Sequence, residues 1–431
     1  MTGKKPSYNE QLKKFSGFYK LTSLERLRII QEYIPDLTEA EIELFSKSGP
    51  LDMDTVNRMV ENAVGIMPIP IGLAVNFLIN NKIYSIPMAI EEPSVIAAAC
   101  NSAKLTLSTG GFTASTTEQI MIGQIQILDL SEPEKAVKIL LKNKAKIIDI
   151  ANTCDKTLVD LGGGARDVQA KIIDTRVGKM VICEILVDCL DAMGANAVNS
   201  MTEVLAPLIE DLTGGKVLLR ILSNLADKRL AYAKCVIPKE KLGGEHIVDN
   251  IVAAAAFAES DPYRAATHNK GVMNGISAVI LATANDTRAI EAGAHAYAVK
   301  DGHYGSLTKW IKNNNGDLEG SIEVPMAVGI VGGATRTNPI AQLALKILRV
   351  ESASELAQVA AVVGLAQNLG AIRALATTGI IKGHMKLHSK NLAISAGAKG
   401  ELIDKIAGKM IEEDNVKFSR AKELIEEMQQ K

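Results

Sequence analysis

The chain has few aromatic residues and almost no net charge. Aromatic side chains make up 4% of the 431 residues, Trp310 is the one tryptophan, and the formal net charge is -1. Proteins that hold nucleic acid rely on basic surfaces and on aromatic side chains that stack on bases. A nearly neutral chain also gives no electrostatic attraction to an anionic membrane surface. The composition therefore argues against nucleic-acid and membrane partners.

Cysteines and long apolar runs are also scarce. The five cysteines are Cys100, Cys154, Cys183, Cys189 and Cys235. They form no Cys-x-x-Cys pair, and an odd number does not complete a disulfide framework. The polar start, MTGKKPSYNEQLKK, lacks the apolar core of a signal peptide, and no run approaches the about 18 apolar residues of a membrane span. We therefore expect a soluble, cytoplasmic protein.

Length and patterning predict more than one domain. A chain of 431 residues exceeds the size at which a single hydrophobic core usually stops growing. Residues 119–227 interleave strand-like and helical runs, which is typical of a small α/β unit. The flanking regions, 1–118 and 228–377, contain Ala- and Gly-rich helices, and residues 378–431 form a tail that ends in a helix.

Hydrophobic periodicity predicts the individual elements. Helices are expected at 53–64, 94–105, 133–153, 192–212, 276–284 and 421–428. Strands are expected at 74–79, 83–89, 120–128, 168–173, 179–186 and 216–221. Thr38 followed by Glu39 and Glu41 has the character of a helix start, because early acidic residues favour the helix N-terminus.

The segment DPYRAATHNKGVMNGISAVILATAND, from Asp261 to Asp286, places a polar stretch before an apolar run. Lys270 lies in the polar stretch and Asp286 closes the apolar one. This arrangement suits a site that holds a cation steady in an apolar pocket. The alternative is a capped core helix with a surface ion pair, because ion-pair networks also occur away from functional sites.

Two acidic residues, Glu91 and Glu92, stand just before Pro93 at an expected helix start. Acidic residues favour the helix dipole at this place, which is one interpretation. The other is a general acid, a carboxyl group that stays protonated near neutral pH. Apolar neighbours such as Ile86 and Met88 would supply the desolvation that this requires.

Two histidines, His384 and His388, would share one helix face. Such a pair can ligate a metal, but no Glu completes an HExxH pattern, and we predict no metal site. A histidine on a closing C-terminal flap suits a proton donor instead. Solvated surface histidines are the alternative.

The segment DAMGANAVN, from Asp191 to Asn199, opens an expected helix with small residues. Small residues and Gly194 let the backbone approach a phosphate group. No GxGxxG pattern is present, so a Rossmann site is not indicated. The alternative is a helix that packs tightly through Ala and Gly.

Five motifs occur in order along the chain. They are ENAVG at 61–65, PMAIEEPS at 87–94, DAMGAN at 191–196, the polar stretch 261–274 and Gly383-His384. Together they resemble the class II 3-hydroxy-3-methylglutaryl-coenzyme A (HMG-CoA) reductases, and the resemblance spans nearly the whole chain. It implies a four-electron reduction of HMG-CoA to mevalonate and coenzyme A, through a hemithioacetal and mevaldehyde, with NADH or NADPH.

The resemblance also implies a mixed α/β (α+β) fold. A large HMG-CoA-binding domain, 1–118 and 228–377, would surround a long central helix. A small ferredoxin-like domain, 119–227, would bind NAD(P), and residues 378–431 would form a mobile C-terminal helical flap. The active site would lie at the interface of a homodimer, to which ENAVG belongs.

The resemblance assigns roles to particular residues. The implied catalytic residues are Glu92, Lys270, Asp286 and His384. The implied substrate-binding residues are Ser94, Arg264, Asn274, Gln367 and Asn368, with Lys20 as a candidate contact for coenzyme A. The implied cofactor-binding residues are Asp155, Asp191, Met193, Gly194, Asn196 and Asn199.

In these roles Lys270 would neutralise the charge that develops on the carbonyl oxygen, and Asp286 would hold that lysine charged and oriented. Glu92 would protonate the mevaldehyde oxygen, and His384 the leaving thiolate. Asp155 resembles the carboxylate that accepts from the ribose 2′-hydroxyl in NADH-using relatives, which predicts NADH rather than NADPH.

Two other function classes stay open at this point. A non-redox coenzyme A-ester lyase or hydratase could use the same Lys, Asp and Glu, but it would need neither DAMGAN nor Asp155. A non-catalytic acyl-coenzyme A sensor would not need all four catalytic side chains.

Overall fold

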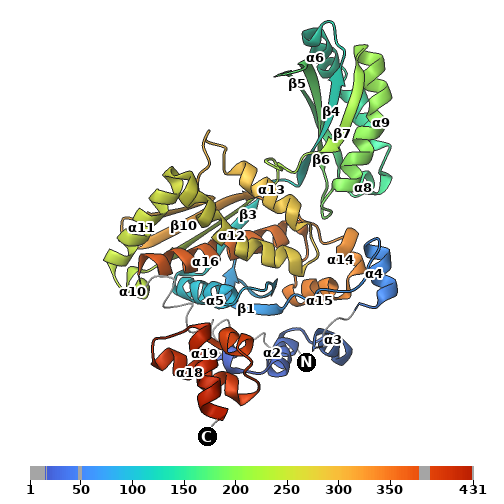
Figure 1. Cartoon of the computed structure of the whole chain (residues 1–431). Coiled ribbons are helices and arrows are strands. Elements are labelled where there is room, and N and C mark those ends of the chain that lie inside the picture. Colours follow the sequence, from blue (N-terminus) through green and yellow to red (C-terminus); the bar gives the residue numbers. More distant parts are fainter. Residues whose placement is uncertain (1–14, 16, 47–50, 378–388, 430–431) are drawn as a thin grey trace, which may run out of the picture.

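The computed structural model describes residues 15, 17–46, 51–377 and 389–429 (Figure 1). A large unit contains a six-stranded sheet with the strand order β2-β1-β3-β8-β10-β9. These strands are β1 (Ile71–Ile79), β2 (Lys82–Ala89), β3 (Phe112–Thr116), β8 (Leu230–Ile237), β9 (Thr308–Lys312) and β10 (Leu318–Pro325). Neighbouring strands are antiparallel except β1 and β3, which pair in parallel through Ile79 and Phe112.

Long helices pack against this sheet. They are α5 (Val95–Thr106), α12 (Pro262–Ala282) and α16 (Ala353–Ala376), with α11 (Glu245–Ser260), α13 (Thr287–Tyr297) and α15 (Pro339–Leu348) around them. The α12 and α16 backbones pack closely because glycines face the contact. A Cβ atom at Gly275 would lie 2.7 Å from the Val363 carbonyl oxygen, and one at Gly364 would lie 2.7 Å from Ile276 Cγ1.

Helix α16 lies at the centre of the large unit and is buried along most of its length. By length and composition it could cross a membrane, so the expectation that no run approaches a membrane span was wrong. Its apolar character has a structural cause, because α16 packs against α5, α12 and several strands at once.

The small unit is a four-stranded antiparallel sheet in the order β5-β6-β4-β7. Its strands are β4 (Ile120–Leu128), β5 (Gly164–Thr175), β6 (Gly178–Asp188) and β7 (Lys216–Leu222). Helices α6 (Pro133–Lys142), α7 (Lys144–Asn152) and α8 (Lys156–Asp160) connect β4 to β5, and α9 (Ala195–Thr213) connects β6 to β7. This βαββαβ connection is ferredoxin-like.

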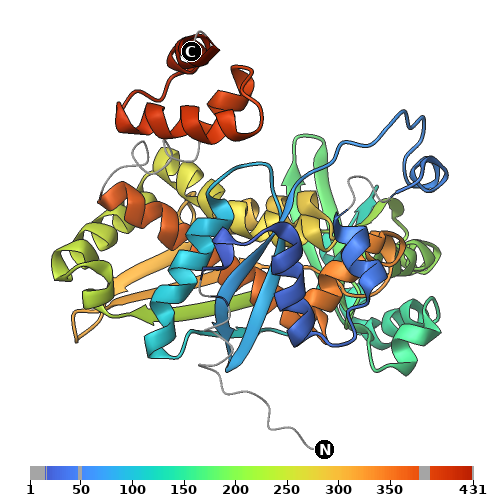
Figure 2. The ribbon, with the colours of Figure 1, turned by 90° about the horizontal axis from the view of Figure 1, so that it is seen from below.

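Two smaller clusters flank the large unit (Figure 2). The N-terminal elements are η1 (Phe18–Lys20), α2 (Ser23–Tyr33), α3 (Glu39–Ser46) and α4 (Met53–Met59). Residues of α2 and α3, including Ile30 and Ile42, share a core with Val75 and Ile347. Helices α18 (Glu401–Glu412) and α19 (Phe418–Gln429) have a core of their own.

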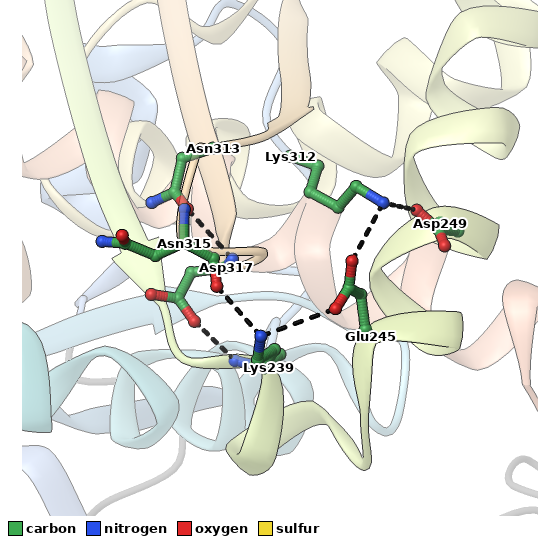
Figure 3. Close-up of polar contacts among 7 residues, drawn as sticks. All are labelled: Lys239, Glu245, Asp249, Lys312, Asn313, Asn315 and Asp317. Carbon is green, nitrogen blue, oxygen red and sulfur yellow. Dashed lines mark hydrogen bonds and ion pairs between the residues drawn. The ribbon is translucent and has the colours of Figure 1, made fainter.

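A polar network joins the β9–β10 turn to α10 (Lys239–Leu242) and α11 (Figure 3). Lys239 Nζ donates to the Asn315 carbonyl oxygen at 3.0 Å, and Lys312 Nζ contacts Asp249 at 2.6 Å and Glu245 at 3.2 Å. The pairs are exposed, so each contributes roughly 0–1 kcal/mol. Two further short elements are η2 (Leu107–Thr109) and α14 (Gly333–Thr337).

The mixed helix–sheet fold class was predicted correctly. Three helices differ from their expected bounds by more than three residues or are interrupted, and the others differ by one to three residues at an end. The helix expected at 53–64 ends at Met59, and the one expected at 133–153 breaks at Asn143. The helix expected at 276–284 begins at Pro262. There the Asp261 side chain accepts from the Arg264 backbone N–H at 2.7 Å, and a proline occupies the first turn, so the polar stretch is helical too.

Candidate functional site

A cavity of about 390 Å³ lies between α5, α12 and α16 and the turn that joins β2 to α5. All of the predicted substrate-binding residues except Lys20 line it, together with two of the predicted catalytic residues. They are Ser94, Arg264, Asn274, Gln367, Asn368, Glu92 and Lys270. Residues separated by more than 250 positions in the sequence therefore meet at one place.

Lys270 and Glu92 form an ion pair at the edge of this cavity. Lys270 Nζ donates to Glu92 Oε2 at 2.9 Å, and the side chains are 62% and 34% exposed. Lys270 projects from α12, whereas Glu92 lies in the turn before α5. The structure thus places a cation directly beside the predicted proton donor.

Asp286 does not join this pair within one chain. It caps α13 by accepting from the Ala289 N–H at 3.0 Å, and it lies 3.6 Å from Arg288. Lys270 and Ala282 are separated by about 18 Å along the axis of α12. Within one subunit the rest of α12 therefore keeps Asp286 apart from Lys270, and the role of Asp286 in holding Lys270 stays a prediction.

Ser94 reaches the cavity from a constrained backbone position. Its φ is 77°, in the left-handed region that non-glycine residues rarely adopt. As the N-cap of α5 it makes no side-chain capping bond within the described chain, although its carbonyl oxygen accepts from Ala98 N–H at 2.8 Å. The Ser94 hydroxyl therefore makes no hydrogen bond to the first turn of α5 and is available to a ligand in the cavity.

Arg264 supplies a positive charge that has no carboxylate partner among the described residues. The Arg264 backbone N–H donates to the Asp261 carboxylate, but the Arg264 guanidinium forms no ion pair within the described residues. Partial burial lowers the pKa of Arg264 from its ordinary value. A half-buried cation in a cavity is suited to an anionic ligand group, because a carboxylate can take two parallel hydrogen bonds from a guanidinium.

A buried polar network lies behind the cavity. Trp310 Nε1 donates to Asn368 Oδ1 at 2.7 Å, and the Thr308 hydroxyl donates to the same oxygen at 3.0 Å. His268 Nε2 lies 2.7 Å from the Thr308 hydroxyl and 3.0 Å from Asn368 Nδ2. Burial, and then the charge of Arg264, lower the pKa of His268 to about 4, so its ring is neutral at physiological pH.

The predicted cofactor residues gather at the N-terminus of α9. Gly194 is the N-cap, with a φ of 103° and no side-chain capping bond in this part of the chain. A Cβ atom there would lie 2.3 Å from Cys189 Sγ, so only glycine fits. The first N–H groups of α9 and the exposed Asn196 are thus presented to solvent, which fits a dinucleotide phosphate.

Three other predicted cofactor residues also have structural contacts. Asp191 Oδ1 accepts from the Ala353 N–H at 2.7 Å, at the start of α16. The Met193 carbonyl oxygen accepts from Arg229 at 2.9 Å, and Asn199 Oδ1 accepts from the Leu222 N–H at 2.9 Å.

Asp155 is half-buried and begins α8, where its Oδ1 accepts from the Leu158 N–H at 2.9 Å. The adjacent Cys154 thiol contacts the Ser200 carbonyl oxygen of α9 at 3.6 Å. The Asp155 loop therefore lies beside the first turns of α9, and the second carboxylate oxygen of Asp155 is not used by this cap.

Lys20 and His384 are two further predicted residues. Lys20 is on η1 and does not line the cavity. His384 falls outside the described residues, as does His388.

Sequence reasoning assigned no role to two residues that support the site. Arg229 is 1% exposed and donates to the carbonyl oxygens of Ala192 and Val328 as well as Met193. No local pattern marks it. His268 could have been found, because it follows Arg264 by four residues and so shares its helix face.

Comparisons with known proteins show the family of this chain. Residues 22–389 match the family model described as hydroxymethylglutaryl-coenzyme A reductase. The chain is 53% identical over 412 residues to the 3-hydroxy-3-methylglutaryl-coenzyme A reductase of Archaeoglobus fulgidus, covering 96% of this chain and 94% of that protein. It is 37% identical to a probable reductase of Borreliella burgdorferi, covering 88% of each.

Solved structures agree as well. The HMG-CoA reductase of Streptococcus pneumoniae superposes with a TM-score of 0.82 at 37% identity, covering 96% of this chain and 99% of that one. A second structure of the class II enzyme from that organism, bound to NADPH in open conformations, gives a TM-score of 0.81 at 38% identity and covers 84% of this chain and 100% of that one. The chain belongs to the hydroxymethylglutaryl-coenzyme A reductase family and resembles its class II members.

Proposed function

We propose that this protein interconverts HMG-CoA and mevalonate plus coenzyme A, using a nicotinamide dinucleotide. One observation carries the proposal: a single cavity contains the Lys270–Glu92 pair, the guanidinium of Arg264 and the amides of Asn274 and Gln367. Among the described residues, that guanidinium has no carboxylate partner. This set matches a substrate that has a carboxylate at one end and a reactive carbonyl at the other. The bound nicotinamide would supply the hydride for each reduction step.

The cavity residues would divide the chemistry between them. Arg264 would hold the free carboxylate of the substrate as a charge-assisted pair. Lys270 would donate to the carbonyl oxygen, where negative charge develops during reduction. Glu92, in contact with the same ammonium group, would protonate the mevaldehyde oxygen. His384, by family resemblance, would protonate the coenzyme A thiolate.

We propose that the active unit is a homodimer. Lys270 lies in the middle of α12, whereas Asp286 follows its C-terminal end, so a second subunit would supply its own Asp286 to Lys270. The segment between α4 and β1, which includes ENAVG, supports such an interface. Its apolar side chains Val60, Val64 and Met67 are 58%, 99% and 87% exposed.

The small unit, 119–227, is the proposed dinucleotide-binding domain, and the large unit, 1–118 with 228–377, the proposed HMG-CoA-binding domain. The uncapped N-terminus of α9 would hold a phosphate group. Asp155 beside it would accept from the ribose 2′-hydroxyl and repel a 2′-phosphate, so we propose NADH as the preferred cofactor over NADPH.

The remaining assignments follow from the family. Lys20 would contact coenzyme A, and residues 378–431 would close over the site as a flap. The net charge of -1 gives no electrostatic attraction to nucleic acid or to an anionic membrane surface, and we propose a cytoplasmic location. A coenzyme A-ester lyase or a non-catalytic sensor is not favoured by the family match.

One spectrophotometric assay tests the proposed function. HMG-CoA should drive oxidation of NADH, and mevalonate with coenzyme A should drive reduction of NAD, both followed by nicotinamide absorbance. A lyase would consume the thioester without any change in nicotinamide absorbance. A sensor would bind the thioester without turnover, and either result would contradict the proposal.

A further inference from the structure

A chain of four half-buried polar side chains joins α12 to α13 and to the loop that follows α13. The Ser277 hydroxyl of α12 donates to Glu291 Oε1 of α13, and Glu291 Oε2 lies 3.7 Å from His295 Nε2, one turn further along α13. His295 Nδ1 in turn lies 2.7 Å from the Tyr304 hydroxyl. None of the four residues lines the cavity, and the proposed reaction uses none of them.

The order of these groups argues against a nucleophilic role for Ser277. An activated serine hydroxyl donates to a general base, most often a histidine ring, whereas Ser277 donates to a carboxylate. The contact with His295 holds the pKa of Glu291 below its ordinary value, although burial opposes this. A carboxylate of low pKa is a good hydrogen-bond acceptor but a poor base. The Ser277–Glu291 bond is therefore a contact between two helices.

Each side of this contact is close to a predicted catalytic residue. Ser277 follows Lys270 by seven residues on α12, which is about two helical turns, so the two side chains stand on one helix face. Glu291 follows Asp286 by five residues, and Asp286 is the N-cap of α13. The bond therefore fixes how the two helices lie relative to one another, together with the catalytic side chain that each one carries.

The position of the Asp286 carboxylate follows that of α13. Its Oδ1 accepts from the Ala289 N–H at 3.0 Å, so the carboxylate is attached to the first turn of the helix. The side chain is 42% exposed, which leaves it accessible to a second subunit. Residues 283–285 connect α12 to α13, and within them Ala284 has a φ of 51°, in the left-handed region.

The far end of α13 is tied to α12 as well. Tyr304, the contact of His295, directly precedes Gly305 in the sequence. The Gly305 carbonyl oxygen accepts from Asn269 Nδ2 at 2.9 Å, and Asn269 is the residue before Lys270 on α12. Polar contacts thus hold α13 on α12 near both of its ends, and the Ser277–Glu291 bond is the one nearer to Asp286.

We infer that Glu291, bonded to Ser277, positions Asp286 for an active site shared between two subunits. The inference rests on the proposed function, in which the partner subunit's Asp286 holds Lys270. Glu291 acts through Asp286 and is a positioning residue. Its effect on the rate can be large, because a misplacement of about 1 Å at a catalytic group can cost roughly a hundredfold.

Steady-state kinetics with HMG-CoA and a nicotinamide cofactor test this role. Glu291→Leu keeps most of the side-chain volume but removes the acceptor, so kcat should fall roughly tenfold to a hundredfold while KM for HMG-CoA stays constant. Glu291→Gln keeps an oxygen that accepts from Ser277 and should retain most of the wild-type kcat. Ser277→Ala removes the same bond from the α12 side and should also lower kcat. It decides the question if Glu291→Leu does not fold.

Glu323→Leu is the matched control. Glu323 is a half-buried carboxylate on β10 that contacts Tyr297, at the C-terminal end of α13, and Lys300 just beyond it. It therefore contacts the same helix as Glu291 does, but at the end away from Asp286 and without a bond to α12. Its kcat should equal that of the wild type.

Refolding in pairs separates a positioning effect from general damage to the subunit. Glu291→Leu should recover activity when it is refolded with Lys270→Ala, because each mixed dimer then has one site in which an intact Lys270 meets a correctly placed Asp286. It should not recover activity with Asp286→Ala, because every Asp286 carboxylate in that mixed dimer is absent or misplaced. General damage would make no difference between the two combinations.

The outcomes distinguish this inference from the proposed function. A wild-type kcat in both Glu291→Leu and Ser277→Ala would overturn the inference and leave the proposed function intact. Equal losses in Glu291→Leu and Glu323→Leu would overturn it too, as would the same recovery with Lys270→Ala and with Asp286→Ala. A wild-type protein that oxidises no nicotinamide cofactor with HMG-CoA would instead refute the proposed function, and the inference with it.

Discussion

Lys270 and Glu92 are in direct contact, with Nζ and Oε2 2.9 Å apart, although 178 positions separate them in the sequence. The pair joins α12 to the turn before α5 at the edge of the cavity. A substrate carbonyl oxygen that binds Lys270 would therefore also lie within reach of Glu92. Lys270 would then stabilise the negative charge on that oxygen, and Glu92 beside it would transfer the proton.

Replacing Lys270 with alanine tests its electrostatic role. Loss of a donor to a developing oxyanion typically costs about 2.7–4 kcal/mol, so kcat for HMG-CoA reduction should fall about 10²–10³-fold. Because the ion pair is largely exposed, the free energy of unfolding should change by less than about 1 kcal/mol. Lys104→Ala, at an exposed lysine of α5, is the control. Turnover by Lys270→Ala at the wild-type rate would exclude the assigned role.

Mixing two inactive variants tests whether Asp286 acts across subunits. Lys270→Ala and Asp286→Ala should each be inactive, since each lacks part of the site. After the two variants are unfolded and refolded together, half of the dimers should contain one subunit of each variant. One of the two active sites in such a mixed dimer is intact, so activity should return to about a quarter of the wild-type value. Steady-state rates before and after mixing give the measurement. No recovery, with mixed dimers verified by mass spectrometry, would place both residues in one subunit.

Asp155→Ala tests the cofactor preference. The wild type should show a higher kcat/KM with NADH than with NADPH, because a carboxylate accepts from a 2′-hydroxyl and repels a 2′-phosphate. The variant should lose this preference, mainly through a higher KM for NADH. Asp160→Ala, at the other end of α8, is the control. A strong preference of the wild type for NADPH would end the hypothesis.

Arg229→Lys tests how the Asp191–Gly194 loop is held. The guanidinium donates to the carbonyl oxygens of Ala192, Met193 and Val328, and a lysine cannot reach all three. Each carbonyl left unpaired costs about 1–3 kcal/mol, so the free energy of unfolding should fall by that order. KM for the dinucleotide should rise while KM for HMG-CoA stays constant. Equal changes in both KM values would argue against a specific effect on this loop.

His268 predicts a pH dependence of stability. Burial lowers its pKa from 6.5 to about 4 in the folded protein, so between these values the unfolded chain binds more protons. Stability therefore rises with pH in this window. The contribution of His268, about 3 kcal/mol, is complete above pH 6.5 and is lost as pH falls toward 4. Urea unfolding at several pH values from about 4.5 to 7.5 gives the free energy of unfolding at each pH. This free energy should rise more steeply with pH for the wild type than for His268→Gln. The same pH dependence of the free energy of unfolding in both proteins would contradict this role of His268.

Much of the fold was predictable because its signals are local. The strand β4 has the bounds that its alternating pattern predicts, and Gly194 marks the start of α9. The polar residues of α12 were identified, although the start of the helix was placed too late. Residues that contact distant segments carry no such signal, and Arg229 is the example. Its function depends on three carbonyl groups from other parts of the chain.

The sequence by itself determined which residue types are available and on which elements they stand, because helical and strand periodicity act over a few neighbouring residues. Only the tertiary structure decided that Lys270 contacts Glu92, that Asp286 lies near the far end of α12, and that His268 contacts Thr308 and Asn368. These relationships depend on how α5, α12, α16 and β9 pack together. Packing is set by burial and close approach summed over the whole core, which no short segment encodes.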